Sequence, residues 1–389
     1  MFTRSSIAGL AGLLGAALLA AGCSEPTGPR PGAASDPARR VPFAPSFDVL
    51  PRPGGIVLDQ QNSSLSESGT RLIKGFNPTN PHRGDAIVVT FFWVGSTNIV
   101  TSVTDVLTDA FFTPVGNSYA LVEYVTAGGL SMATYVATNV QGFPDPNPDP
   151  TVVLAVQATL SQPVTDGGIA MSAYSGVSSL PAVARGAHSS GSGSDSSITP
   201  APAGPIAMGA GSLVYGATVS GLAGVDPPAG FTNITNISDA AMKADLEYLV
   251  PSAAGVINPT WTWFFNAQTS WLSTAVVLNP IQPPHLVFTV QPSTTLPLMA
   301  ITPAVRVTVT DEQGNPATSY SGQVTVAIGQ NGGILLPGTL SGTGTVTVVN
   351  GVATFSDLSI DQAGTGYTLV VTAPGATGAT SAPFNIGAF

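Results

Sequence analysis

The chain has 389 residues, of which 43% are hydrophobic and only 8% are charged, with 44 glycines and 34 prolines. Coiled coils need abundant Glu, Lys and Arg, and highly charged disordered chains contain few apolar residues, so this composition excludes both classes. The formal net charge of −10 argues against a nucleic-acid partner, which would require a basic face. An all-β extracellular protein of two or three domains fits best.

Residues 1–22 have the pattern of a signal peptide, with Arg4 before an uncharged apolar run that is too short to span a membrane. Leu19-Ala20-Ala21-Gly22-Cys23 resembles a bacterial lipobox, although Ala20 stands where that family usually carries Leu. The resemblance implies cleavage before Cys23 and lipid attachment to it. An ordinary secretory signal is the alternative. Cys23 is the only cysteine, so the mature chain has no disulfide and no thiolate metal site.

A Pro-rich tether is predicted over residues 23–53, because residues 24–53 hold eight prolines and show no sustained apolar periodicity. Eight of the 11 Lys and Arg lie at or before Arg83. This asymmetry indicates either a basic stalk near anionic lipid or simply a well-solvated tether. Ser24 resembles the residue that follows the lipidated cysteine in lipoproteins of an outer membrane. We therefore expect export and anchoring through lipid at the cell surface, in an outer membrane.

Residues 54–281 contain many short β-rich runs separated by Gly, Pro, Asn and Asp, which is typical of a β-sandwich. Nearly continuous apolar or β-branched runs over 85–94 and 151–160 predict buried central strands. In residues 245–250, Leu, Tyr and Val alternate with Asp245 and Glu247, so we expect a strand whose two acidic side chains face water. A short helix over 240–249 is the alternative. Residues 189–197 are almost entirely Ser and Gly, which predicts a mobile surface loop.

The prolines of residues 280–284 predict a boundary, with 282–284 as the linker and a second sandwich over 285–389. Residues 305–310 and 324–328 alternate apolar and polar side chains, as strands with one buried face do. Asn350-Gly351 predicts a hairpin turn. Tyr367 occupies the position of a tyrosine corner.

Specific segments carry two resemblances. In residues 285–389 they are Leu286-Val287-Phe288, Gln291-Pro292-Ser293, Asp311-Glu312-Gln313-Gly314-Asn315, Asn350 to Phe355 and Ala363 to Tyr367; these resemble a bacterial immunoglobulin-like repeat of surface adhesins. In residues 54–281 they are Gly84-Asp85, Val103-Thr104-Asp105, Tyr135 to Asn139, Ala173-Tyr174-Ser175-Gly176 and the run to Trp271; these resemble an uncharacterised jelly-roll module of secreted bacterial proteins. The resemblances imply an all-β protein in which a jelly-roll or concanavalin-like sandwich precedes an immunoglobulin-like sandwich. The immunoglobulin-like repeats carry no catalytic residues to transfer, and in the jelly-roll-like segment Ala173 stands where that resemblance leads us to expect Glu.

Motifs for metal or integrin binding are incomplete. Asp145-Pro146-Asn147-Pro148-Asp149 begins like a calcium loop, but Pro150 replaces the glycine of the sharp turn and no Glu occupies the twelfth position, which rejects an EF-hand. A looser calcium site on Asp145 and Asp149 is the alternative to a plain Pro-rich loop. Arg83-Gly84-Asp85 leads directly into a predicted strand, whereas integrin ligands sit at exposed loop tips. We assign no metal and no cofactor.

Catalytic arrangements are equally incomplete. Residues 129–133 imitate a nucleophile elbow, but they lie in a predicted hairpin and not between a strand and a helix. His82, His188 and His285 are the only histidines available as general bases. Glu123 could pair with an aspartate as glycosidases require, yet nothing in the sequence fixes that pairing. No catalytic residue is therefore assigned.

The four tryptophans, at positions 93, 261, 263 and 271, all lie in the first predicted sandwich. Trp261 and Trp263 share one strand face, so they are candidate glycan-binding residues; filling the core is the alternative. We predict a non-catalytic surface lipoprotein for adhesion or display, whose partners are the membrane, through Cys23, and an extracellular glycan or protein. A carbohydrate-binding protein and a polysaccharide-active enzyme are the two alternatives.

Overall fold

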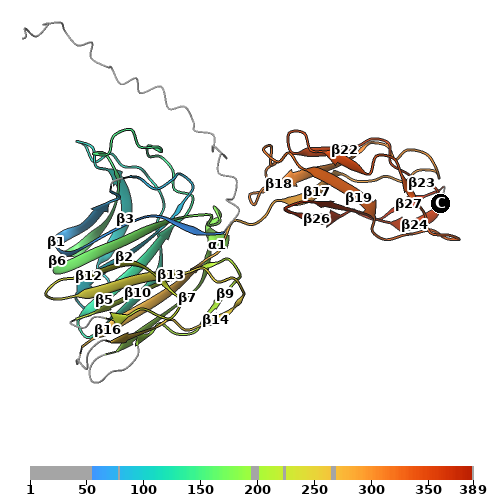
Figure 1. Ribbon diagram of the computed structural model, residues 1–389. Coiled ribbons are helices and arrows are strands. Elements are labelled where there is room, and N and C mark those ends of the chain that lie inside the picture. Colours follow the sequence, from blue (N-terminus) through green and yellow to red (C-terminus); the bar gives the residue numbers. More distant parts are fainter. Residues whose placement is uncertain (1–54, 78, 194–200, 222–224, 264–268, 388–389) are drawn as a thin grey trace, which may run out of the picture. The chain divides into compact units, whose positions relative to one another are not determined.

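The protein is all-β, as its composition and periodicity predict. The computed structural model describes residues 55–77, 79–193, 201–221, 225–263 and 269–387, and in these it contains 27 strands and a single four-residue helix, α1 (Pro181–Ala184). Strands β1 to β16 pair only with one another among the described residues, and so do β17 to β27 (Figure 1). We call the first group the first sandwich and the second group the C-terminal sandwich. In the described part of the chain, no helix is long and apolar enough to cross a membrane.

Two antiparallel sheets face each other in the first sandwich. The first sheet has the strand order β1-β6-β2-β5-β4, and β3 also pairs with β6. The second sheet has the order β12-β13-β10-β16-β7. The strands of the first sheet are β1 (Val57–Gly75), β2 (Ala86–Val94), β3 (Val100–Leu107), β4 (Ala120–Ala127), β5 (Leu130–Ala137) and β6 (Leu154–Ser175). Those of the second are β7 (Arg185–Gly193), β10 (Leu213–Ser220), β12 (Thr232–Ser238), β13 (Lys243–Leu249) and β16 (Trp271–Leu278).

Strand β2 shows why the first sheet is buried on both faces. Val88 and Phe92 pack into the cluster between the two sheets, whereas Phe91 and Trp93 pack into a separate cluster on the other face. Every residue of the strand except Val94 is buried. The structure therefore confirms the central strand that the nearly continuous apolar run over 85–94 predicts. A strand that is covered on both faces needs no alternation of apolar and polar side chains.

An additional layer covers the outer face of the second sheet. It consists of short strands, namely β8 (Ala201–Pro202), β9 (Ile206–Met208), β11 (Val225–Asp226), β14 (Gly255–Ile257) and β15 (Thr260–Trp263). Val214 and Val277 of the sheet pack there against Ala201, Ile206 and Trp261 of the layer.

This layer corrects one sequence-based expectation about orientation. Residues 245–250 lie largely in strand β13, as predicted, but Asp245 and Glu247 do not face water: they are 3% and 0% exposed. Alternation identified the face correctly, because both side chains point away from the core between the sheets. The layer then covers that face, and sequence periodicity cannot reveal a covering segment.

The Ser/Gly run also differs from its prediction. Residues 189–193 belong to strand β7, which pairs with β16, while residues 194–197 lie outside the described residues. A Cβ atom at Gly191 would collide with the carbonyl oxygen of Pro202, and one at Gly193 would collide with the ring of Trp271. Gly191 thus permits close cover by the outer layer, and Gly193 makes room for the ring of Trp271 on the neighbouring strand β16.

The C-terminal sandwich has one hydrophobic cluster between its strands. Its main path runs β21-β19-β25-β26-β17-β18-β22, with two further pairs, β20-β23 and β24-β27. The strands are β17 (His285–Val290), β18 (Val305–Thr310), β19 (Gln323–Ile328), β20 (Leu340–Ser341), β21 (Thr345–Thr347), β22 (Val352–Phe355), β23 (Ser359–Ile360), β24 (Gly364–Tyr367), β25 (Leu369–Ala373), β26 (Ala376–Thr380) and β27 (Phe384–Ile386).

Two local predictions are confirmed in this sandwich. Asn350 and Gly351 both have positive φ, at 50° and 78°, and Val349 and Val352 exchange backbone hydrogen bonds around them, as a tight hairpin requires. Tyr367 is fully buried, and its hydroxyl donates to the carbonyl oxygen of Gln362 at 3.0 Å, which is the contact of a tyrosine corner.

Candidate functional site

A histidine and two aspartates meet where strand β1 passes the turn that leads into β2. Asp59 is the extra residue at a register shift of β1, between the pairs Leu58↔Tyr174 and Gln60↔Ala173. Such a bulge re-aims a side chain. His82 and Asp85 come from the turn itself, in which the Asp85 N–H donates to the His82 carbonyl oxygen at 3.2 Å. Gly84 permits this turn because its φ is +94°.

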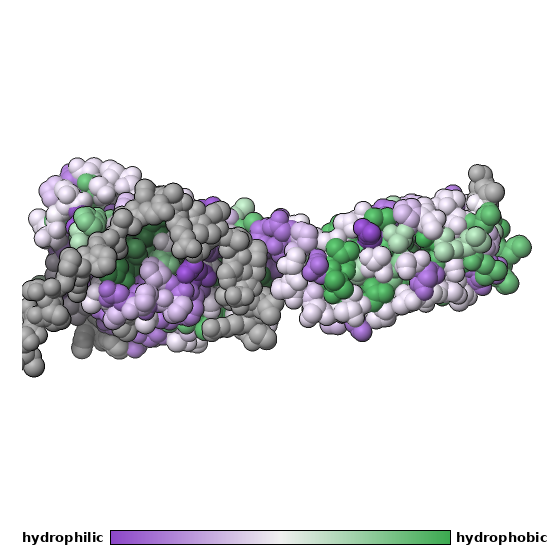
Figure 2. Space-filling model, turned by 90° about the horizontal axis from the view of Figure 1, so that it is seen from above, coloured by the Kyte–Doolittle hydropathy of each residue, from purple (hydrophilic) through white to green (hydrophobic). Residues whose placement is uncertain are grey.

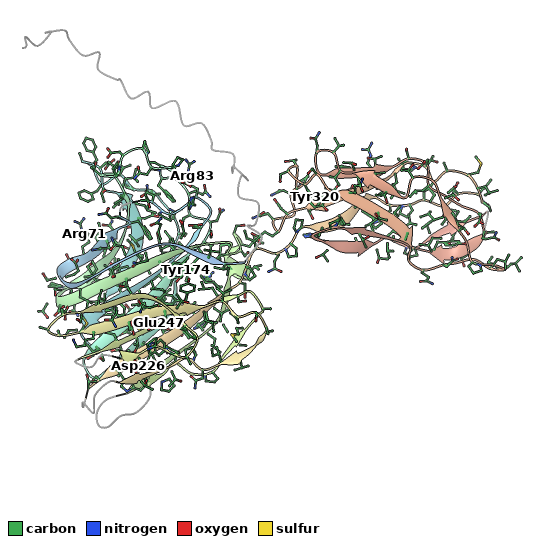
Figure 3. All side chains as sticks on the ribbon, viewed as in Figure 1. Arg71, Arg83, Tyr174, Asp226, Glu247 and Tyr320 are labelled. Carbon is green, nitrogen blue, oxygen red and sulfur yellow. The ribbon has the colours of Figure 1, made fainter. Side chains whose placement is uncertain are left out.

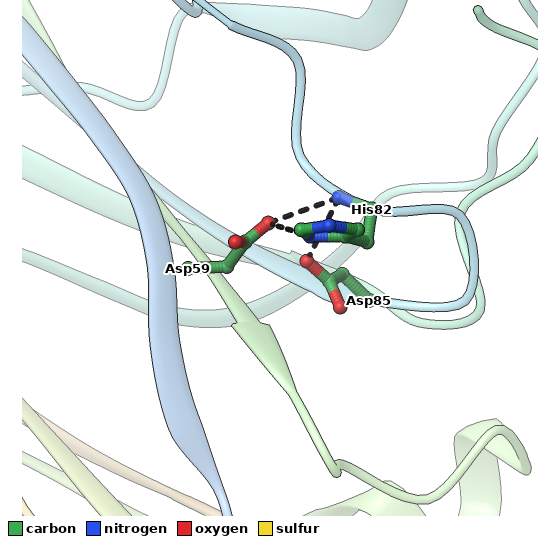
Figure 4. Close-up of side chains that lie close together, drawn as sticks. All are labelled: Asp59, His82 and Asp85. Carbon is green, nitrogen blue, oxygen red and sulfur yellow. Dashed lines mark hydrogen bonds and ion pairs between the residues drawn. The ribbon is translucent and has the colours of Figure 1, made fainter. Parts of the chain in front are cut away.

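The three side chains converge closely (Figure 4). The Nδ1 atom of His82 lies 2.9 Å from Oδ2 of Asp59. The backbone N–H of His82 donates to the same oxygen at 2.9 Å and to Oδ2 of Asp85 at 3.2 Å. One ligand atom from each side chain lies within 4.8 Å of the others. Asp85 is 2% exposed, whereas the His82 side chain is 48% exposed, so the cluster is closed on one side and open to solvent on the other.

Burial and like charge determine the protonation of Asp85. Burial raises the pKa of Asp85 to about 9, and the adjacent carboxyl of Asp59 adds to the increase through a shared hydrogen bond and repulsion. Asp145 contributes further repulsion, and its carboxylate is held near the turn because it accepts a hydrogen bond from the Arg83 N–H at 2.9 Å. At neutral pH Asp85 therefore holds its proton.

The calcium alternative placed Asp145 and Asp149 together. In the structure Asp145 serves the turn around Arg83, whereas Asp149 accepts hydrogen bonds from the backbone and hydroxyl of Thr151 at 2.9 and 2.6 Å. The acidic residue that joins the histidine is instead Asp85, the last residue of the Arg83-Gly84-Asp85 tripeptide. Its burial removes it from the surface that an integrin would contact.

A second acid–histidine pair bridges the two sheets of the first sandwich. Glu123 of β4 accepts from His188 of β7, with 2.6 Å between Oε2 and Nδ1, and from the hydroxyl of Ser190 at 3.1 Å. A carboxylate that orients a histidine is one half of a nucleophilic site. Within the described ranges, however, no hydroxyl is hydrogen-bonded to the ring of His188. Ser131, of the elbow-like segment, is buried in the β4–β5 hairpin and donates to the Gly95 carbonyl oxygen.

Trp261, one of the two candidate glycan-binding residues, fills the outer layer of the first sandwich. It is fully buried, and its indole N–H donates to Oε2 of Glu247 at 2.9 Å. Glu247 is labelled in Figure 3. Its ring offers no face to a sugar in this structure, which agrees with the core-filling alternative. The backbone of Trp263 lies in β15, but its side chain is outside the described residues.

Glu247 itself is unusual. Burial raises its pKa to about 10, with Asp245 adding repulsion and a hydrogen bond, and its second oxygen, Oε1, has no hydrogen-bond partner. This carboxyl is therefore neutral at pH 7 and belongs to the packing of the outer layer.

A different kind of feature lies at one end of the C-terminal sandwich. Two loops expose six large apolar side chains, which we call the apolar tip: Leu296, Leu298, Met299, Ile334, Leu335 and Leu336, at 55%, 73%, 59%, 62%, 92% and 63% exposure. Both loops attach to one segment, because the Leu298 N–H donates to the Ile360 carbonyl oxygen and the Ile334 N–H to that of Ala363. Figure 2 shows apolar residues gathered at this end, in green.

Hydrogen bonds hold both loops of the tip in shape. The side chain of Asn331 bridges its loop, since Oδ1 accepts from the N–H groups of Gly333 and Gly338, and Nδ2 donates to the Gly338 carbonyl oxygen at 2.7 Å. Leu298 has a φ of +66°, a strained conformation for a bulky residue. The loops thus hold these apolar side chains in defined, exposed positions.

Sequence reasoning identified neither the Asp59 cluster nor the apolar tip. The tip had a readable signal, because Ile334-Leu335-Leu336 lies between a Gly pair and Pro337-Gly338, which marks an apolar run inside a loop. The cluster had none, since a bulge and a turn 23 residues further along the chain bring His82 to Asp59. No family model, curated protein or solved structure matches this chain.

Proposed function

We propose that this protein is a non-catalytic surface lipoprotein, anchored through Cys23 at the outer membrane, that adheres to a protein partner through the apolar tip. The lipobox-like segment and the Pro-rich tether support the anchor, and the resemblance of residues 285–389 to adhesin repeats supports the role. The observation that carries the proposal is the tip itself. Soluble proteins bury large apolar side chains, and a contiguous exposed group of them marks an interaction surface.

The chemistry of the tip favours a protein partner over a glycan. Its six side chains are aliphatic or methionine, whereas sugar rings stack on flat aromatic faces. Burial of apolar area stabilises a complex by roughly 25 cal/mol per Å² before the costs of association. Met299 is flexible and polarisable, which suits a surface that adapts to its partner.

The test uses full-length protein displayed on bacterial cells, which are allowed to settle on surfaces coated with proteins or with glycans. The double substitution Ile334→Glu and Leu335→Glu places two charges in the tip. We expect about a tenfold or greater loss of adhesion to the protein surfaces, which corresponds to at least 1.4 kcal/mol.

Val349→Glu is the matched control, because Val349 is also exposed, at 66%, but lies in the Asn350-Gly351 hairpin of the same sandwich. It should leave adhesion unchanged. Equal adhesion by the tip variant and the wild type would contradict the proposal, and adhesion to glycans alone would favour the carbohydrate-binding alternative. Cys23→Ser provides the test of anchoring: the protein should move from the membrane fraction to the soluble fraction.

A further inference from the structure

We propose that Asp59, His82 and Asp85 form a binding site for a single divalent transition-metal ion, for which Zn²⁺ is the representative. The inference is independent of the adhesive role. It rests on the convergence of one imidazole nitrogen and two carboxylate oxygens within 4.8 Å of one another, on a turn and a bulge that hold them in place.

The arrangement already has the features of a coordination site. Oδ2 of Asp59 and Oδ2 of Asp85 both accept from the backbone N–H of His82, so one rigid peptide group aligns the two carboxyls. Asp85 is almost completely buried, whereas the imidazole is half exposed. The protein thus supplies three ligands from one side and leaves the solvent side open for a water molecule, as three-ligand zinc sites do.

The donor set selects the class of ion. Imidazole nitrogen suits Zn²⁺ and other late first-row metals, whereas Ca²⁺ takes six to eight oxygen ligands and Mg²⁺ keeps most of its water. Zinc binds histidine nitrogen and aspartate oxygen at about 2.0–2.2 Å. Because the only cysteine is Cys23, which precedes the first sandwich and is the expected site of lipid attachment, no thiolate in the folded body competes for the ion.

Charge gives the site its driving force. Two aspartates lie against each other here, with Asp145 nearby, so a divalent cation is attracted to the carboxylates once Asp85 has lost its proton. On binding, the proton that Asp85 holds is released to solvent. Nδ1 of His82 lies 2.9 Å from Oδ2 of Asp59, and the contact between these two atoms is replaced by one bond from each of them to the metal.

The bound ion adds a link between two segments that already contact each other through hydrogen bonds and apolar packing. Asp59 belongs to β1, an end strand in the path of the first sheet, and His82 and Asp85 belong to the turn before the central strand β2. An ion that binds the folded state and not the unfolded chain raises the unfolding temperature by mass action. We therefore expect Zn²⁺ to stabilise the first sandwich.

Calorimetric titration of ZnCl₂ into the full-length, tag-free protein in detergent tests the site, with CaCl₂ and MgCl₂ as comparison salts. We expect one equivalent of Zn²⁺ to bind and no equivalent of Ca²⁺ or Mg²⁺. Tryptophan fluorescence reports the unfolding of the first sandwich, because all four tryptophans precede residue 272. Its thermal midpoint should rise by a few degrees with saturating Zn²⁺.

Three variants identify the ligands. His82→Gln and Asp85→Asn should each weaken Zn²⁺ binding by about tenfold or more. Asp85→Asn has nearly the same shape as the protonated carboxyl, so it should fold like the wild type. His188→Gln is the matched control, since it removes the other histidine that contacts a carboxylate. Absence of Zn²⁺ binding, unchanged binding in either ligand variant, or loss of binding in His188→Gln would overturn the proposal.

Discussion

The two sandwiches bury and expose opposite kinds of side chain. In the first sandwich the buried residues include the carboxyl groups of Asp85, Asp105, Asp245 and Glu247. In the described part of the C-terminal sandwich the buried polar residues are Thr308, Thr310 and Ser381, none of them charged. The C-terminal sandwich instead exposes large apolar side chains, those of the apolar tip.

Layering explains the contrast. The first sandwich has hydrophobic clusters on both faces of its first sheet and on both faces of its second, so polar side chains on outward positions become enclosed. The C-terminal sandwich has a single cluster, and much of the other face of its strands stays in water. In β19, for example, Val324 and Val326 are buried while Thr325 is exposed. We infer that ion chemistry belongs to the first region and surface contact to the second.

We expect the largest loss of stability from a single substitution in the outer layer. Trp261→Ala removes a fully buried indole and also the N–H group that donates a hydrogen bond to Glu247. We expect the free energy of unfolding of the first sandwich to fall by about 3–5 kcal/mol. Urea unfolding followed by the fluorescence of the remaining tryptophans measures this change.

Hydrogen exchange of peptides from residues 285–389 is the internal control for Trp261→Ala. Their protection should stay unchanged, because the C-terminal sandwich has its own core. A destabilisation below about 1 kcal/mol would mean that the outer layer is not part of the cooperative fold, and the contrast between the two regions would then lose its basis.

Buried carboxyls should also separate the regions by pH. Glu247 has a pKa of about 10 when folded and about 4.3 when unfolded, so between these values only the folded state binds its proton. The contribution of Glu247 to the stability of the first sandwich is therefore complete below about pH 4 and is lost as the pH rises toward 10. Glu247→Gln should reduce the loss between pH 6 and pH 8 by about 2–3 kcal/mol, measured by urea unfolding at each pH.

The C-terminal sandwich supplies a control of opposite sign. The hydroxyl and N–H of Thr343 lower the pKa of Asp357, which is exposed, so its small contribution is present above about pH 4 and is lost as pH falls. Asp357→Asn should leave the alkaline limb untouched. An unchanged pH profile in Glu247→Gln would show that this carboxyl titrates normally.

Features that depend on nearby residues of the chain could be predicted from the sequence, whereas features that depend on distant segments could not. The alternation in residues 324–328 and the Asn350-Gly351 turn depend on neighbours in the chain, and both were predicted correctly. The strand over 305–310 was also predicted, but Thr308 and Thr310 on its polar face are buried. Burial of Asp245 and Glu247 depends on strands that come from residues 201–208 and 255–263, so the strand was predicted but its exposure was wrong. The Ser/Gly run failed for a related reason, because small side chains accommodate a covering layer as well as they form loops.

Site residues follow the same rule. Tyr367 was predicted from a segment of seven residues that contains its hydrogen-bond acceptor, Gln362. Glu123 and His188 were each noted, but a separation of 65 residues hid their contact. Trp261 and Trp263 share a strand, which periodicity could show, whereas only the fold shows that Trp261 is enclosed. The adhesive and lipid-anchored character remains a prediction from the leader and the repeat.

The smallest predicted effect concerns the strained residue of the apolar tip. Leu298 adopts a left-handed φ of +66° and is 73% exposed, so Leu298→Asn loses little packing and gains a residue that tolerates this conformation. We expect the C-terminal sandwich to become more stable by up to about 1 kcal/mol, seen as slower hydrogen exchange of its peptides, while adhesion weakens. Leu335→Asn, in the other loop and without a positive φ, should weaken adhesion with no gain in stability. Equal stability changes in the two variants would show that the backbone at Leu298 is not strained. The exposed apolar residues of the tip would then impose no cost on the stability of the C-terminal sandwich.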